Sequence, residues 1–135
     1  MAKSEKIISG KRKTSVAKVR IREGTGKIFI NKVPYEMLNE FHKLAIEEPI
    51  MIAKKTLKKF NYDIHVKIIG GGRESQIESA RLAIAKALVD KTKSETLKKE
   101  LAKYDKYILI ADTRRKEAYK PGDSKARAKR QSSKR

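Results

Sequence analysis

The sequence predicts a single domain that combines strands and helices, organised around the stretch from Tyr62 to Lys91. Apolar and polar residues alternate between Asp63 and Ile68, the pattern of a half-buried strand. Three glycines, Gly70 to Gly72, then allow the backbone to turn where other residues would be restricted. From Ser75 onward the apolar residues recur at helical spacing, and many of them are alanines. We therefore expect a strand, a glycine turn and a slim helix to form the central unit of the fold.

The residues before this unit predict further strands. Apolar and basic residues alternate from Ser15 to Arg22, which predicts a strand whose outer face is cationic. Gly24 and Gly26 lie in the segment 23–26, which predicts a hairpin turn, with residues 27–30 as the returning strand. Residues 1–8 are expected to form a mobile start or a short edge strand.

Helical spacing predicts the remaining elements. In residues 35–60 we expect two helices, interrupted near Glu47, because Pro49 suits the first turn of a helix. The segment from Thr92 to Glu95 has the form of a capping box, so a lysine-rich surface helix should begin there. A short extended apolar stretch from Tyr107 to Ala111 is expected to be the last part that touches the core.

The charge of the chain is its clearest functional signal. Thirty-five lysines and arginines stand against 16 acids, a formal net charge of +19. A compact fold with this charge repels itself unless a polyanion neutralises it. Nucleic acid is therefore the first candidate partner, and an anionic membrane surface is the second.

Several classes of protein are excluded or disfavoured by composition. The chain has no cysteine and only two histidines, His42 and His65, which argues against disulfides, thiolate chemistry and metal clusters, so no cofactor is expected. No apolar run approaches the ~20 residues of a membrane span, and the N-terminal residues do not resemble a signal peptide. We expect a cytoplasmic protein.

The composition changes sharply after residue 113, which predicts a boundary between a globular domain, residues 1–113, and an extended basic tail, residues 114–135. The tail has no Ile, Leu, Val, Phe or Met, and its ten cations and two acids carry +8 of the +19. Such a segment cannot bury enough apolar surface to fold alone, so it should order against a polyanion. A solvated solubility tail or a targeting patch is the alternative interpretation.

Two features of the globular part also suggest an anionic partner. A continuous basic patch is predicted from six residues: Lys11, Arg12, Lys13, Arg20, Arg22 and Arg73. The turn formed by Gly70 to Gly72 lies before a helix, where it could cradle a phosphate or serve only as a tight turn.

No carboxylate pair, nucleophile with its base or metal-ligand spacing is recognisable, so no enzyme is expected. A DNA-compacting protein and a small phosphotransferase remain as alternatives.

Three stretches resemble one known family. The first is Gly70-Gly71-Gly72-x-x-Ser75-Gln76-x-x-Ser79, the second is Gly10 to Ala17, and the third is Ala111 to Gly122 with its paired arginines. In this order they resemble the universal small-subunit ribosomal protein nine family, of archaeal type. The ending Ser133-Lys134-Arg135 departs from that type and is similar to bacterial members.

This resemblance implies an α+β fold, similar to the second domain of ribosomal protein five, with helices on one face of a mixed sheet. It also implies a structural place in the head of the small subunit, bound to the 3′ major domain of the rRNA and to neighbouring ribosomal proteins. The tip of the tail, Lys134 and Arg135, would contact P-site tRNA. Seven further tail cations would bind rRNA: Arg114, Arg115, Lys120, Lys125, Arg127, Lys129 and Arg130.

Overall fold

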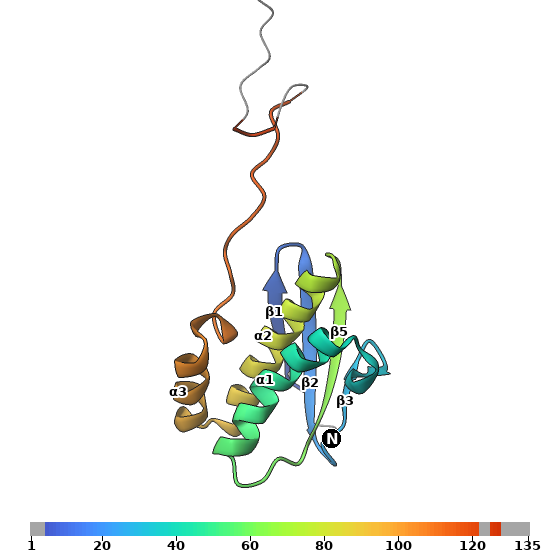
Figure 1. The fold of residues 1–135 in the computed structure, drawn as a ribbon. Coiled ribbons are helices and arrows are strands. Elements are labelled where there is room, and N and C mark those ends of the chain that lie inside the picture. Colours follow the sequence, from blue (N-terminus) through green and yellow to red (C-terminus); the bar gives the residue numbers. More distant parts are fainter. Residues whose placement is uncertain (1–4, 122–124, 128–135) are drawn as a thin grey trace, which may run out of the picture.

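The computed structural model describes residues 5–121 and 125–127, and it shows an α+β fold (Figure 1). One mixed sheet contains five strands in the order β1-β2-β5-β3-β4. The strands are β1 (Ile7–Arg12), β2 (Ser15–Glu23), β3 (Ile28–Ile30), β4 (Val33–Pro34) and β5 (Tyr62–Ile69). The helices are α1 (Glu40–Thr56), α2 (Arg73–Thr92) and α3 (Glu95–Tyr104), with short 3-10 turns η1 (Tyr35–Met37) and η2 (Lys106–Ile108). The predicted α+β class with a mixed sheet is confirmed.

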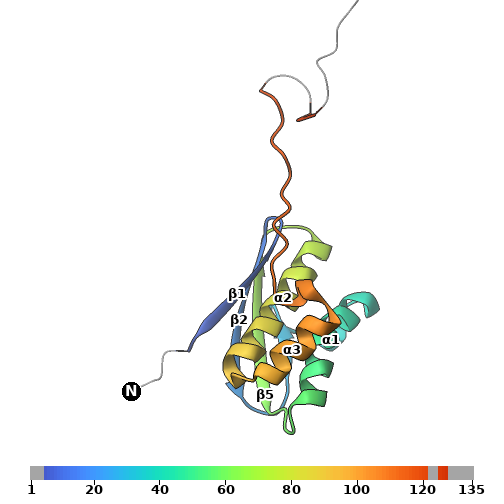
Figure 2. The ribbon, with the colours of Figure 1, turned by 90° about the vertical axis from the view of Figure 1, so that its left-hand side faces the viewer.

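All three helices lie on one side of the sheet (Figure 2). The apolar residues of β2 and β5 face these helices, so that Ala17, Val19 and Ile64 are fully buried. The predicted inner stripe of the central helix, which includes Ile84 and Leu88, is buried as well. The opposite face of the sheet carries the polar and basic residues of the same strands, and no helix within residues 5–121 covers it. The core therefore forms a single layer between the sheet and the helices.

The predicted hairpin at residues 23–26 is wrong. β2 and β3 do not pair, because β5 lies between them, antiparallel to β2 and parallel to β3. The Asp63 side chain at the start of β5 accepts hydrogen bonds from the backbone N–H groups of Thr25, Gly26 and Lys27 at 2.9–3.0 Å. These bonds, above all the one from Lys27, lower the pKa of Asp63. The local sequence predicted the turn correctly, but the Asp63 carboxylate binds its N–H groups and β5 separates the two strands that the turn connects.

The glycine turn packs directly on the end of the β1–β2 hairpin. Gly70 and Gly71 both have positive φ, and an added Cβ would lie 2.6 Å from the Thr14 oxygen and 2.8 Å from Ser15 Cβ respectively. These two glycines are therefore required by the backbone conformation and by the close approach. Gly72, in contrast, has no neighbour within 4 Å of such a Cβ. Close packing thus accounts for the first two glycines without a bound phosphate.

Three predictions for the helices need correction. α1 is one continuous helix that passes through Pro49, whose side chain is fully buried, so its packing offsets the loss of one backbone donor. The cap of α3 is Ser94, which accepts a hydrogen bond from the Leu97 N–H, whereas Thr92 still belongs to α2. Residues 106–108 form a 3-10 turn rather than an extended stretch, and Ile108 is buried as expected.

Candidate nucleic-acid interface

Five of the six basic residues of the predicted patch lie in two groups rather than one. Lys11 and Lys13 lie at the end of the β1–β2 hairpin, and Arg73 begins α2 directly after the glycine turn that packs there. Arg20 and Arg22 lie further along β2, on the face of the sheet without helices. Arg20 is five residues along β2 from Ser15, at the turn, which corresponds to about 17 Å. One continuous patch is therefore replaced by a hairpin-end group and an open-face group.

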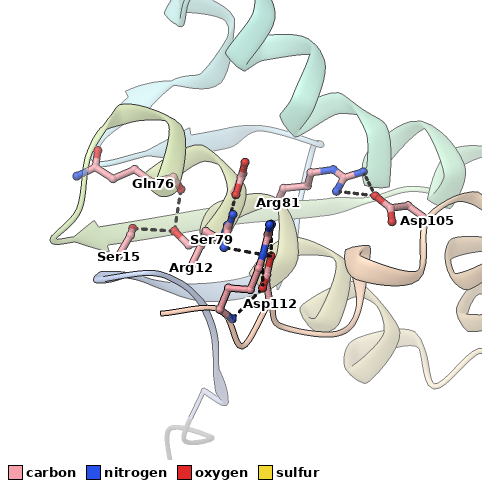
Figure 3. Close-up of polar contacts among 9 residues, drawn as sticks. Arg12, Ser15, Gln76, Ser79, Arg81, Asp105 and Asp112 are labelled. Atoms are coloured by element: carbon pink, nitrogen blue, oxygen red, sulfur yellow. Dashed lines mark hydrogen bonds and ion pairs between the residues drawn. The ribbon is translucent and has the colours of Figure 1, made fainter. Parts of the chain in front are cut away.

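Arg12 is enclosed by acidic residues. Its Nε donates to Glu78 of α2, and its Nη1 lies 3.1 Å from Asp112 Oδ2, although the geometry of that contact is not that of a hydrogen bond. Only 15% of the side chain is exposed. Figure 3 shows Arg12 beside Asp112, with the Ser15–Ser79 contact nearby. Arg12 therefore connects β1, α2 and the segment after η2, and it offers less positive charge to a partner than its neighbours do.

Asp112 marks the point where the basic C-terminal segment begins. The Arg114 side chain donates to this carboxylate through Nε and Nη2 at 2.9 and 2.8 Å, and the backbone N–H of Arg114 donates as well. These bonds hold the pKa of Asp112 down to about 2. Because the pKa is lowered on folding, the ionised carboxylate stabilises the folded state at pH values above the ordinary pKa of 3.8. This contribution is lost as the pH falls toward 2. At neutral pH the carboxylate is fully charged between Arg12 and Arg114.

The segment from Asp112 to Pro121 has no helix or strand, and Arg114 to Pro121 is exposed. It leaves the fold at the end that carries the β1–β2 turn (Figures 1 and 2). Further on, Arg127 pairs with Glu117 at 2.9 Å, and the Lys116 ammonium lies over the Tyr119 ring. The described cations of the predicted site are Arg114, Arg115, Lys120, Lys125 and Arg127. The others, Lys129, Arg130, Lys134 and Arg135, lie outside the described residues.

The open face of the sheet carries basic residues that the predicted patch did not include. Lys18 of β2 lies directly opposite Lys67 of β5, and Arg20 lies opposite His65. Lys32, in the turn after β3, lines a groove on this face together with Lys18 and Lys67. Arg22, at the end of the face, is paired with Glu5 through its Nε at 2.6 Å. The alternating pattern marked Lys18 and Lys67 as outward-facing, but only the pairing of β2 with β5 brings them together.

Other types of site are not recognisable in the part of the chain that the structure describes. Within residues 5–121 and 125–127, no cluster of three or more histidine and acidic side chains could hold a metal ion. None of the helices in that part combines the length and the apolar character that crossing a bilayer requires.

A comparison with known families agrees with the resemblance of the motifs. The model of the family described as Ribosomal protein S9/S16 matches residues 10–135. The chain belongs to this family. Three relatives, from three strains of Methanococcus maripaludis, each carry the name "Small ribosomal subunit protein uS9". Each is 42% identical over 127 residues, which are 92% of this chain and 93% of the relative. The predicted family and its archaeal type are thereby confirmed.

The structure gives a physical reason for several residues of the family motifs. Ser15 and Ser79 are fully buried, and their hydroxyls lie 2.9 Å apart, which ties β2 to α2. The Gln76 side chain donates to the Gly70 oxygen, closing the glycine turn. Gly10 lies so close to α2 that a Cβ would be 2.6 Å from the Ser79 oxygen. These family residues therefore hold the hairpin, the turn and α2 together, while the exposed cations surround them.

Proposed function

We propose that the chain is a structural constituent of the small ribosomal subunit that binds the 3′ major, or head, domain of its rRNA. The observation that carries this proposal is the 42% identity to uS9 proteins over nearly the whole of both chains. The excess of positive charge, +19, and the basic open face of the sheet support it, because phosphate neutralisation dominates the affinity of such proteins for nucleic acid. A member of this family is a structural protein, and no catalytic role is proposed. It would be bound to ribosomes in the cytoplasm, beside other proteins of the head.

The same proposal includes a division of labour along the chain. Residues 1–113 would anchor the protein on rRNA, and residues 114–135 would extend along RNA, with Lys134 and Arg135 reaching P-site tRNA. The buried apolar core ends at Ile108, which supports a boundary soon afterwards. The lack of helix or strand between Asp112 and Pro121 agrees with an extended path. The hairpin-end group, Lys11, Lys13 and Arg73, lies where this segment leaves the fold and would bind the same RNA region.

A competition experiment separates this proposal from a protein that compacts nucleic acid in general. The full-length chain is bound to a labelled transcript of the small-subunit head domain, and unlabelled duplex DNA with the same number of phosphates is added. We expect the transcript to be preferred by at least about tenfold at physiological salt, because a protein specific for rRNA also recognises the shape and the 2′-hydroxyls of the folded RNA. Phosphate contacts alone would not distinguish the two polymers. Equal competition by RNA and DNA would instead support the compacting protein.

A further inference from the structure

A row of side chains crosses the open face of the sheet. Strand pairing places Ile7 of β1 opposite Arg20 of β2, Arg20 opposite His65 of β5, and His65 opposite Phe29 of β3. The rings of Phe29 and His65 are stacked, with centroids 5.3 Å apart and planes 10° from parallel. The face that should be the most polar part of the sheet therefore carries an aromatic pair beside an arginine.

A second row runs parallel to the first and is basic. Lys18 and Lys67 lie two residues before Arg20 and two residues after His65, which places them about 6.6 Å away along their strands. Asn31 and Lys32 extend this row beyond the end of β3. Both rows line one groove of about 760 Å³. One side of the groove thus carries the aromatic pair together with Arg20 and Ile7, and the other side carries the lysines.

The lysines on the cationic side of the groove repel each other. Lys18 and Lys67 are direct cross-strand partners, and like charges in that position are destabilising. Among the described residues no acid lines the groove, and neither these lysines nor Lys32 forms an ion pair. Other basic residues of this face do have an acidic partner: Glu5 pairs with Arg22 and interacts electrostatically with Arg20. An anion bound between the two lysines would remove their repulsion.

We propose that this groove binds an unpaired segment of RNA, with bases against the Phe29–His65 wall and phosphates along Lys18, Lys67 and Lys32. This inference rests on the proposed function and names the surface and the form of RNA involved. Aromatic rings take up bases that are free of a duplex, whereas the bases of an A-form helix are stacked on one another and not available. A sheet face with basic residues and accessible rings matches that chemistry, and a duplex would contact only the lysines.

The chain contains only three phenylalanines, Phe29, Phe41 and Phe60, so the full-length protein can be labelled with fluorophenylalanine and observed by 19F NMR. Phe41, on α1, and Phe60, before β5, serve as internal references away from the groove. The probes are a mixed-sequence RNA oligomer that cannot pair with itself, the duplex of that oligomer, and an abasic ribose-phosphate oligomer of equal length. We expect the unpaired RNA to shift the Phe29 resonance and the other two probes to leave it nearly unchanged.

Matched variants test the same contact by affinity. Phe29→Leu keeps the apolar volume and removes the ring, and we expect it to weaken binding of the unpaired oligomer about fivefold or more. Phe41→Leu makes the same change on α1, where the ring is 79% exposed, and should leave the affinity unchanged. Lys67→Gln should weaken the binding of all three probes, because it removes a phosphate contact rather than a base contact.

The outcomes separate this inference from the proposed function. If the unpaired RNA binds but the Phe29 resonance stays in place, or if the abasic oligomer shifts it equally, the base-binding groove is refuted and rRNA binding through other surfaces stands. If no RNA binds the full-length chain, both proposals fail. A Phe29→Leu variant that binds like the wild type would also overturn the inference.

Discussion

Removal of residues 114–135 should flatten the salt dependence of RNA binding while leaving the domain folded. If the tail makes about eight phosphate contacts, the slope of log affinity against log salt should become shallower by about 6 to 7. Over a fourfold rise in salt this difference amounts to about 10⁴-fold in relative affinity. Filter binding or fluorescence anisotropy across a salt series measures the slope. The fold should persist because the buried apolar residues lie between Ala17 and Ile108.

A matched pair of full-length variants tests whether position matters as well as charge. One variant replaces Arg114, Arg115, Lys125 and Arg127 by Gln, and the other replaces four exposed helical lysines by Gln: Lys54, Lys55, Lys98 and Lys99. Both lose the same charge, but only the tail variant should make the slope shallower, by about 3. Equal changes in the two variants would mean that the tail acts only through net charge. Unfolding of the truncated chain would contradict the boundary near residue 113.

Gly10→Ala should destabilise the fold strongly although it adds a single methyl group. An ideal Cβ at this position lies 2.6 Å from the Ser79 oxygen and 2.7 Å from the Ala83 nitrogen, both backbone atoms of α2. Neither atom can move without shifting the helix, so β1 would have to withdraw from α2. We expect a loss of about 2–3 kcal/mol in the free energy of unfolding, at the upper end of the range for overpacked cores. Urea unfolding followed by circular dichroism measures it.

The control for Gly10→Ala is the same substitution one residue earlier. Ser9 is exposed on the opposite face of β1, and Ser9→Ala should change the free energy of unfolding by less than about 0.5 kcal/mol. A Gly10→Ala variant as stable as Ser9→Ala would show that β1 does not need its close approach to α2. It would also remove the packing explanation for this glycine of the family motif.

The central unit of the fold could be predicted from sequence because its signals are local and agree with one another. Alternation specifies β5, the glycines specify the turn, and the alanine-rich stripe specifies α2. The β2–β3 connection could not be predicted in this way. Gly24 and Gly26 do form a turn, but the Asp63 side chain, nearly 40 residues later, takes its N–H groups and β5 occupies the space between the strands. Pairing between distant strands is not visible in a local pattern.

The same error affected the prediction of the site. With β3 expected beside β2, no local pattern placed Lys67 opposite Lys18 or Phe29 beside His65. The alternation correctly predicted which residues face outward, but the groove depends on which strands are neighbours. Arg12 shows that the orientation of a side chain can also be mispredicted from a local pattern. A run of three cations, residues 11–13, suggests one exposed patch. In the fold Lys11 and Lys13 are exposed, whereas Arg12 turns inward to Glu78 and Asp112.

Pro49 illustrates how packing overrides a local signal. A proline suits the first turn of a helix, and the sequence therefore favoured a break before it. In the structure α1 continues through this residue, whose ring is fully buried among the core elements. The helix loses one backbone hydrogen bond there and retains the burial of Ile46 and Ile50 on the same side.

Ultraviolet crosslinking in living cells, with peptide-level mapping of the adducts, tests whether this chain binds small-subunit rRNA through its open sheet face and its tail. We expect adducts to small-subunit rRNA on the peptides that contain Lys18, Lys67 and residues 114–130, and adducts to tRNA at Lys134 or Arg135. Adducts that are mostly to DNA, or that spread over messenger RNA, would contradict this expectation and leave a general binder of polyanions.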